Sequence, residues 1–287
     1  MAEKGLSIKR KSDRNTTNMH RYRIPELIDK LICGADIILE VLDARFIEQT
    51  RNPRIEKRVK QLGKKLVFIL NKADLADTNT IIREVELHKL KPYVFFSCKN
   101  QMGKGNLKDF IRRESEELGK EAVNLGIVGY PNTGKSSIIN ILSGKSAAKT
   151  SSQAGFTKGI QKVKLSDGIY LIDTPGIIPI NERLKLNPAY LIKHSEIGAK
   201  SWDKTKEPEM VIHKLLESYP GVLEEYYNIQ AERDSEVLIE QLGRKLSYLK
   251  KGGLVDTDRT ARRILRDWQE GKIKPFKKTT NLNKVEN

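Results

Sequence analysis

Short apolar runs alternate with charged stretches over roughly the first 180 residues of the chain. The runs have the length of buried strands and are too short for core helices. They lie at 37–42, 66–70, 93–96, 125–128 and 169–172. Helical stretches separate most of them, for example at 53–62, 80–90 and 107–118. Strands that alternate with helices predict a parallel sheet whose connections cross over its faces.

One further strand is expected to run in the opposite direction. Residues 161–165 alternate between polar and apolar positions, and Asp167-Gly168 separates them from the run at 169–172. An Asp-Gly pair between two strands favours a hairpin, so 161–165 is predicted as an edge strand. Residues 24–33 have helical spacing, and Gly34 is a plausible end to that helix.

The pattern changes near residue 180. Helical stretches follow at 211–216, 222–230, 235–246 and 256–269. The sequence therefore predicts three parts, which are a basic arm over residues 1–20, an α/β domain over 21–180 and a helical C-terminal domain with a basic tail over 181–287.

The charge of the chain is strongly positive and unevenly placed. The formal net charge is +16, with net values of +5 over residues 1–23, −4 over 181–240 and +8 over 241–287. Basic ends of this kind favour a nucleic acid or another polyanion as partner. A soluble, highly charged protein without such a partner is the alternative interpretation.

Composition also predicts what the protein does not contain. Two cysteines, Cys33 and Cys98, are too few for a disulfide framework or a zinc site, and both are expected to be reduced core residues. The polar, basic N-terminus does not have the pattern of a signal peptide, and no apolar run is long enough to span a membrane. We expect a cytoplasmic monomer with no membrane partner.

A phosphate-binding loop follows the run at 125–128. Residues 129–136 read GYPNTGKS, which matches G-x-x-x-x-G-K-[ST] between a strand and a helix. Backbone N–H groups of such a loop bind phosphates, Lys135 is expected to reach the β- and γ-phosphates, and Ser136 to coordinate Mg²⁺. The predicted phosphate ligands are Asn132, Thr133, Gly134, Lys135, Ser136 and Ser137. A glycine turn at an unrelated strand–helix junction is the alternative.

An acidic motif ends the run at 169–172. It reads Asp173-Thr174-Pro175-Gly176. Asp173 is expected to hold a Mg²⁺-bound water, and the Gly176 N–H group to sense the γ-phosphate. A simple Pro-Gly turn is the alternative.

A guanine-reading motif comes before the phosphate loop in the chain. Asn71-Lys72-Ala73-Asp74 follows the run at 66–70. The Asp74 carboxylate can accept both guanine N1–H and the 2-amino group, a donor pair that adenine does not present. Asn71 would contact the edge of the base, and the stem of Lys72 would cover its plane. A polar loop at a strand end is the alternative.

Ser97-Cys98-Lys99 follows the next run, at 93–96. Its backbone N–H groups are expected to face guanine O6, unless this loop has no ligand role. Most GTPases carry the phosphate loop first and the guanine motif later. The reversed order in this chain indicates a rearranged architecture.

Together these motifs resemble the circularly permuted GTPases of the YlqF/YawG type, which include ribosome biogenesis GTPase A. The order that carries the resemblance is NKAD (71–74), SCK (97–99), GYPNTGKS (129–136), Thr157 and DTPG (173–176), with Asp43-Ala44-Arg45 and Arg51-Asn52-Pro53 before them. Residues 256–271 resemble the C-terminal helical domain of that family. The resemblance implies a circularly permuted P-loop GTPase domain, with a six-stranded mixed sheet and helices on both faces, followed by a small all-α domain.

The resemblance also implies how GTP would be hydrolysed. Ile177 stands where Ras-like GTPases have a water-orienting Gln, so intrinsic hydrolysis should be slow. Asn132 would coordinate K⁺, which supplies positive charge in the transition state. His20 matches the position of the family's catalytic His, although Met19-His20-Arg21 differs from the usual Gly-His-Met, and a solvated residue or an RNA contact is the alternative.

Thr157 is the expected switch threonine that closes on Mg²⁺, with Thr150 and Ser151 as alternatives. The predicted catalytic set is His20, Lys135, Thr157 and Gly176. The predicted metal ligands are Ser136, Thr157 and Asp173 for Mg²⁺ and Asn132 for K⁺.

The stretch at 256–269 combines an apolar face with a basic one. Ala261, Ile264, Leu265 and Trp268 have the spacing of a buried stripe. Arg259, Arg262, Arg263 and Arg266 fall on a separate stripe, which suits a phosphate backbone. A solvated helix face is the alternative.

The motifs thus predict GTP hydrolysis. The resemblance implies an assembly factor that acts on the large ribosomal subunit, where GTP and GDP binding would be coupled to rRNA binding and release. The alternatives are a GTP-dependent RNA-modification enzyme or another RNA-binding GTPase not tied to ribosome assembly. A signalling switch with protein partners only is less consistent with the basic tail.

Overall fold

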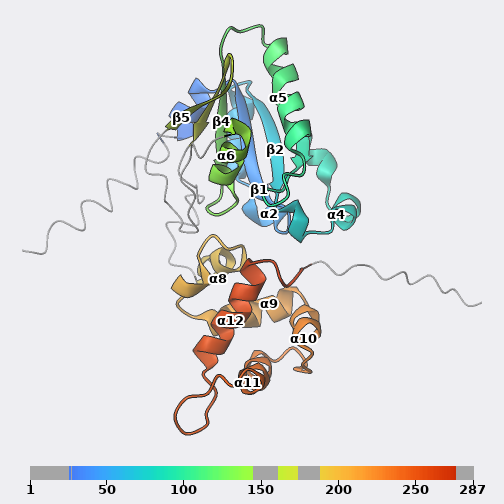
Figure 1. Cartoon of the computed structure of the whole chain (residues 1–287), viewed down its shortest axis with the longest axis vertical. Coiled ribbons are helices and arrows are strands. Elements are labelled where there is room, and N and C mark those ends of the chain that lie inside the picture. The colour runs from blue at the N-terminus through green and yellow to red at the C-terminus, as the bar shows by residue number, and fades with distance from the viewer. Residues whose placement is uncertain (1–25, 27, 145–160, 174–187, 276–287) are drawn as a thin grey trace, which may run out of the picture.

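The computed structural model describes residues 26, 28–144, 161–173 and 188–275. These residues form a sheet domain and a helical lobe, which lie one above the other in Figure 1. The boundary expected near residue 180 lies outside the described residues. In the described part of the chain, no helix is both long and apolar enough to cross a membrane.

The sheet has six strands in the order β3-β2-β1-β4-β6-β5. The strands are β1 (Ile37–Asp43), β2 (Lys65–Asn71), β3 (Tyr93–Phe95), β4 (Val123–Gly129), β5 (Gln161–Ser166) and β6 (Ile169–Asp173). All neighbouring pairs are parallel except β5 and β6, which form the antiparallel hairpin expected from Asp167-Gly168. The predicted mixed sheet is confirmed.

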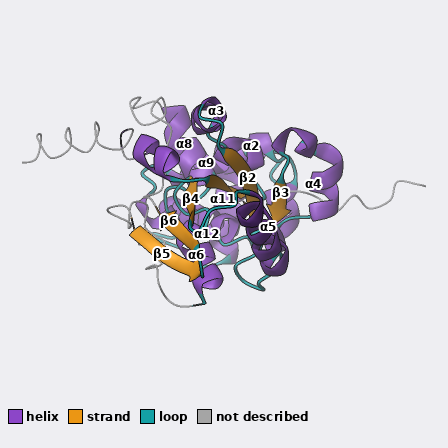
Figure 2. Ribbon diagram, turned by 90° about the horizontal axis from the view of Figure 1, so that it is seen from above, coloured by secondary structure: helices purple, strands orange, loops and turns teal. Residues whose placement is uncertain are grey.

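Helices cover both faces of this sheet, as Figure 2 shows. On one face, α5 (Lys104–Glu117) and α6 (Lys135–Ser143) pack on one side of β1, β2 and β4. On the other face lie α2 (Ile47–Thr50), α3 (Pro53–Gln61), α4 (Thr78–Glu84) and the helical residues 28–34. Residues of β1 alternate between the two layers, so the central strand is buried on both faces.

Two predictions for this domain were wrong in detail. The helix expected over 80–90 ends at Glu84, Val85 is extended, and a separate 3₁₀ turn follows at Leu87–Leu90. The break lets both Leu87 and Leu90 enter the core. Cys33, expected in the core, is exposed, whereas Cys98 is half-buried. Another 3₁₀ turn, Ala73–Leu75, begins inside the guanine motif and ends one residue after it.

The helical lobe contains α8 (Pro188–Glu196), α9 (Pro208–Ser218), α10 (Val222–Tyr227), α11 (Ser235–Lys245), α12 (Thr257–Gln269) and the 3₁₀ turn Trp202–Lys204. Asp256 caps α12 by accepting a hydrogen bond from the Arg259 N–H group at 3.1 Å. The predicted apolar stripe of this helix is buried, including Trp268. The core of the lobe also contains Phe46 and Tyr130 of the sheet domain, so the two parts share one apolar interior.

Candidate nucleotide-binding site

The guanine motif and the phosphate loop meet at one edge of the sheet. β2 ends at Asn71 and β4 ends at Gly129, and both strands run parallel to β1 between them. Loops at the carboxyl ends of parallel strands are the usual place for a nucleotide. The Asn71 Nδ2 atom donates a hydrogen bond to the Thr133 carbonyl at 2.7 Å, so the two motifs contact each other directly.

The phosphate loop is held in a tight conformation. Gly134 has a φ of +100°, and a Cβ atom there would lie 2.1 Å from the Asn71 Nδ2 atom. The Lys135 ammonium donates to the Gly129 and Tyr130 carbonyls at 3.1 and 2.7 Å. It therefore lies over the loop in which a phosphate group would bind. Ser136 and Ser137 are half-buried in the first turn of α6.

The second base-binding loop contacts the first. The Ser97 hydroxyl donates to the Asp74 Oδ1 atom at 2.6 Å, which orients the carboxylate expected to read guanine. The Cys98 thiol lies 3.4 Å from the Asn71 Oδ1 atom. Burial raises the pKa of Cys98 to about 11, so this thiol stays protonated at neutral pH. The Lys99 N–H group donates to the Ser97 Oγ atom at 3.2 Å.

Lys72 is fixed by a buried carboxylate. Its backbone is left-handed, with a φ of 61°, and its ammonium lies 2.8 Å from the Asp43 Oδ2 atom. Arg45 forms a two-pronged pair with the same carboxylate, at 2.8 and 3.0 Å. Burial alone would raise the pKa of Asp43, but the charges of Arg45 and Lys72 outweigh it and hold this pKa far below its usual range. Asp43 is therefore ionised at every pH at which the protein would work.

The helical lobe contacts the guanine loop. The Arg45 Nη1 atom donates to the Trp268 carbonyl at the end of α12, at 3.2 Å. Phe46, next to Arg45, packs on the Trp268 ring with centroids 5.9 Å apart. Beyond α12, Gly271 lies against the Leu75 side chain. The end of α12 is thus joined to the loop that carries Lys72 and Asp74.

The helical lobe also contacts the phosphate loop. The Asn132 Nδ2 atom donates to the Gly198 carbonyl at 2.8 Å. Tyr130 is 1% exposed, and its ring lies edge-on to His194 of α8 with centroids 6.2 Å apart. The Lys193 ammonium lies 5.4 Å from the centre of the same ring. Tyr130 and Asn132 occupy positions at which the phosphate-loop pattern accepts any residue. The motif alone therefore gave no signal for these contacts with the helical lobe.

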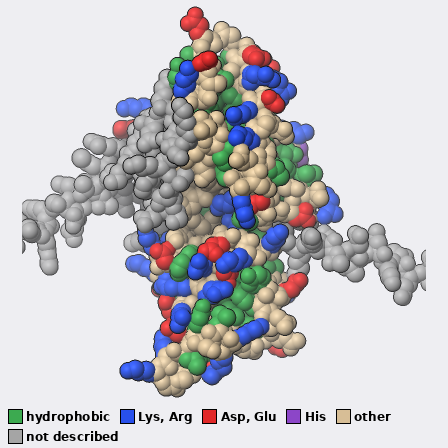
Figure 3. Space-filling model, viewed as in Figure 1, with side chains coloured by type: hydrophobic (Ala, Val, Ile, Leu, Met, Phe, Trp, Pro, Cys, Tyr) green, Lys and Arg blue, Asp and Glu red, His purple; other side chains and the backbone are tan. Residues whose placement is uncertain are grey.

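The arginine stripe of α12 is largely paired within the protein. Arg262, Arg263 and Arg266 each pair with the acid four residues later or earlier, at 2.7 Å. The partners are Asp258, Asp267 and Glu270 in that order. The Arg259 guanidinium lies 4.0 Å from the centre of the Tyr248 ring. On the face drawn in Figure 3, Lys and Arg side chains are scattered among Asp and Glu over both lobes.

Of the remaining predicted site residues, the structure describes only the backbone of Asp173. Asp173 ends β6 and pairs in register with Ile127 of β4, which places its backbone close to the phosphate loop. His20, Thr157 and Gly176 lie outside the described residues. The Asp43-Ala44-Arg45 segment was recognised in the sequence as a family landmark, but its contacts with Lys72 and Trp268 required the structure.

A match to a known protein family includes the phosphate loop. The profile of a family described as 50S ribosome-binding GTPase matches residues 124–239. The match begins on β4, immediately before the phosphate loop. The guanine motif at 71–74 lies ahead of it, as the permuted order requires.

Similar proteins extend over nearly the whole chain. An uncharacterized GTP-binding protein of Methanocaldococcus jannaschii is 40% identical over 90% of this chain and 68% of its own length. Nucleolar GTP-binding protein 2 of Neurospora crassa is 36% identical over 96% of this chain and 45% of its own length. The chain spans about half the length of the nucleolar relatives it matches.

Solved structures show the same arrangement. YlqF from Thermotoga maritima is 27% identical and covers 87% of this chain and 94% of its own in the GNP-bound form, with a TM-score of 0.63. The GDP-bound form gives a TM-score of 0.62 over 85% of this chain. The likeness therefore includes both the permuted sheet domain and the helical lobe.

Proposed function

The chain belongs to the circularly permuted GTPases of the YlqF/YawG type, and from that membership we propose that it hydrolyses GTP during assembly of the large ribosomal subunit. The description of the matching profile names 50S ribosome binding, and several relatives are named as nucleolar GTP-binding proteins. The excess of positive charge at both ends of the chain supports rRNA as the partner.

The guanine loop would provide the specificity for GTP and GDP. Asp74, oriented by Ser97, accepts hydrogen bonds from the guanine N1–H and amino groups. Asn71 would contact the base edge. Of the backbone N–H groups expected to face O6, that of Cys98 is the proposed donor, because the Ser97 and Lys99 N–H groups donate to the Met102 carbonyl and to Ser97 Oγ. Lys72 is held by Asp43, and its stem would cover the base plane.

The phosphate loop would stabilise negative charge on the phosphates. Residues 132–137 provide backbone N–H groups, and Lys135 leaves the carbonyls of its own loop to contact the β- and γ-phosphates. The hydroxyl of Ser136 and the carboxylate of Asp173 are hard oxygen donors that suit Mg²⁺, with Thr157 as the third ligand. Ser136 belongs to α6 and Asp173 ends β6, and both elements adjoin the phosphate loop. When bound, Mg²⁺ neutralises charge on the β- and γ-phosphates.

Hydrolysis is proposed to be slow without help. Ile177 has no group that orients water, so we propose stimulation by the ribosome and by K⁺ held through Asn132. The hydrogen bond from the Asn132 amide to Gly198 would fix the direction of its Oδ1 atom, the K⁺ ligand. His20 is the proposed N-terminal catalytic residue, and the Gly176 N–H group the γ-phosphate sensor.

The observation that carries the proposed coupling is the double contact of the helical lobe. It holds the guanine loop through Arg45 and the phosphate loop through Asn132. A change in either loop on GTP binding or hydrolysis would alter the position of α8 or α12, and with it the proposed rRNA contacts of the arginine stripe. Intrahelical acids partly neutralise that stripe, so the basic ends are proposed to contribute as well.

One experiment tests this proposal. GTP turnover is measured with and without purified large ribosomal subunits, in K⁺ and in Na⁺, together with cosedimentation in GDP or a non-hydrolysable GTP analogue. We expect faster turnover with subunits, faster turnover in K⁺, and cosedimentation that depends on the analogue. A Lys135→Ala variant, which removes the phosphate-binding ammonium, is the inactive control.

The outcomes separate the alternatives. Equal turnover in K⁺ and Na⁺ would remove the K⁺ role of Asn132. Unchanged stimulated turnover in His20→Ala would exclude catalysis by His20. Nucleotide-dependent binding to other structured RNA but not to subunits would favour an RNA-binding GTPase outside ribosome assembly. We also propose that the protein is a monomer and acts in the cytoplasm. Sedimentation analysis of the purified chain tests the oligomeric state.

A further inference from the structure

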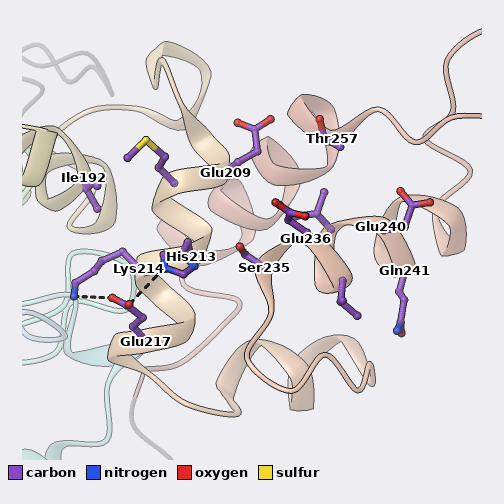
Figure 4. A pocket seen from close by; sticks show the side chains of 13 residues that line it. Ile192, Glu209, His213, Lys214, Glu217, Ser235, Glu236, Glu240, Gln241 and Thr257 are labelled. Atoms are coloured by element: carbon purple, nitrogen blue, oxygen red, sulfur yellow. Dashed lines mark hydrogen bonds and ion pairs between the residues drawn. The ribbon is translucent and has the colours of Figure 1, made fainter.

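A groove of about 1080 Å³ opens on the helical lobe. Its walls are α9 and α11, with Ile192 of α8 and Thr257 of α12 completing the lining (Figure 4). None of the lining residues belongs to the nucleotide motifs or to the arginine stripe of α12, although Glu209 lies close enough to Arg262 to add to the rise that Asp258 causes in the pKa of that guanidinium. The groove is therefore a surface that the proposed contacts with GTP and rRNA do not use.

The groove exposes apolar side chains between two helices. Met210 of α9 is 45% exposed and Val237 of α11 is 38% exposed, and Ile239 of α11 is a buried lining residue. The lining residues of α9 follow one helical face, at 209, 210, 213, 214 and 217. When a partner covers apolar side chains in such a groove, their removal from water lowers the free energy of the complex. A groove between two helices has the shape that accepts a third helix.

The charge of the groove is opposite to that of the chain. Four glutamates, Glu209, Glu217, Glu236 and Glu240, lie along it with one lysine, Lys214, a net charge of −3 in a protein of +16. Arg244, which is not a lining residue, pairs with Glu240 at 2.5 Å and offsets part of this charge. Glu217 pairs with Lys214 at 3.1 Å and lies 3.4 Å from His213, as Figure 4 shows. Carboxylates repel phosphates, so this surface does not suit RNA. It is complementary to Lys and Arg side chains.

We propose that this groove binds a basic, amphipathic helix of a partner protein. The apolar stripe of that helix would cover Met210 and Val237, and its basic side chains would pair with Glu236 and Glu240 of α11. The helical lobe would then have two kinds of contact, one with RNA through its basic surfaces and one with protein through this groove. The proposal concerns a surface separate from the GTPase site and does not depend on hydrolysis.

A designed peptide tests the proposal with the full chain. The probe is a fluorescein-labelled peptide of about 18 residues, with Leu at helical spacing and Lys on the other positions. Binding is measured by fluorescence anisotropy at moderate salt. A scrambled peptide of the same composition tests the need for an amphipathic helix, and a Leu/Glu peptide tests the sign of the charge. We expect the Leu/Lys peptide to bind and the scrambled and Leu/Glu peptides not to bind.

Variants locate the binding surface. Glu236→Lys/Glu240→Lys should weaken peptide binding roughly tenfold or more, because two attractive pairs become repulsive. Glu116→Lys/Glu121→Lys changes the net charge equally at two exposed acids of the sheet domain and should leave binding unchanged. Met210→Ser should weaken binding, whereas Leu118→Ser, which alters a side chain of similar exposure on the other lobe, should not. GDP affinity should be the same in all four variants, which controls for folding.

Other outcomes would overturn the proposal. Equal binding of the scrambled or acidic peptide, or equal losses in the control variants, would mean that no specific groove is involved. Displacement of the peptide by a short single-stranded RNA would assign the surface to RNA. Tighter peptide binding after Lys277→Glu/Lys278→Glu would identify the chain's own C-terminal segment as the occupant. A dimer that Glu236→Lys/Glu240→Lys dissociates would identify a second copy.

Discussion

The guanidinium of Arg45 donates a hydrogen bond to the Trp268 carbonyl at 3.2 Å, although 223 positions separate the two residues in the sequence. The same guanidinium holds Asp43, and Asp43 holds Lys72 of the guanine loop. Two ion pairs and one hydrogen bond therefore connect the base-binding loop to the last turn of α12. A rearrangement of either end changes the partners available to the other.

Asp43→Asn should loosen the guanine loop. The change leaves the buried Arg45 and the Lys72 ammonium without their shared carboxylate, and breaking a buried ion pair from one side costs about 3–5 kcal/mol. We expect lower stability in urea unfolding and weaker binding of fluorescent GDP. Asp36→Asn is the matched control. Asp36 directly precedes the first residue of β1, at the opposite end of the strand from Asp43, and pairs with Lys120. Equal GDP affinity in the two variants would show that Asp43 does not position Lys72.

Gly134→Ala should abolish nucleotide binding. The φ of +100° is strained for alanine, and its methyl group would lie 2.1 Å from the Asn71 amide, which joins the two loops. Gly144→Ala is the control, because Gly144 also has a positive φ, +67°, but among the described residues no atom beyond its chain neighbours lies within 4 Å of the added Cβ. It should cost about 1 kcal/mol in stability and retain GDP binding. Calorimetric titration with GDP distinguishes the two, and binding by Gly134→Ala would contradict the packing argument.

Asp74→Asn should change the base that the site prefers. An amide at this position presents both a donor and an acceptor, so it mismatches the 2-amino group of guanine and matches the 2-carbonyl of xanthine. We expect GTP affinity to fall by roughly 100-fold and xanthosine triphosphate to bind better than GTP, since a site built for hydrogen bonds rejects mismatched groups strongly. Competition against a fluorescent nucleotide measures both. Retained preference for GTP would mean that Asp74 does not read the base.

Glu40 should make stability depend on pH. This residue is fully buried on β1, its Oε1 atom accepts from the Asn52 N–H group, and its Oε2 atom has no hydrogen-bond partner among the described residues. Burial raises its pKa to about 8 from an ordinary 4.5. Between these values the folded protein holds a proton that the unfolded chain releases, so raising the pH destabilises the fold.

The Glu40→Gln variant measures this contribution. Between pH 5 and pH 8, the wild-type free energy of unfolding should fall by up to about 1.4 kcal/mol per pH unit more than that of Glu40→Gln. Urea unfolding at several pH values gives both curves, without nucleotide. Glu121→Gln, at an exposed position, should keep the wild-type slope. Parallel curves for wild type and Glu40→Gln would show that Glu40 does not titrate in this range.

The sequence by itself determined the sheet, the order of its motifs and the chemistry of its loops. Five apolar runs placed five of the strands, and alternation with the Asp-Gly pair placed the antiparallel edge strand, because local periodicity and turn chemistry act over a few residues. The motifs at 71–74 and 129–136 predicted a guanine site and a phosphate site, since these contacts come from fixed local patterns.

Only the tertiary structure decided how these parts act on one another. Asn71 contacts Thr133 within the sheet domain, and the pairs Arg45–Trp268 and Asn132–Gly198 join the two lobes. No local pattern encodes such pairs, because they depend on which segments the fold brings together. The same reason explains the arginine stripe, whose spacing predicted an open basic face. In the structure its guanidinium groups pair with acids and carbonyls of the lobe itself, such as those of Asp267 and Trp202.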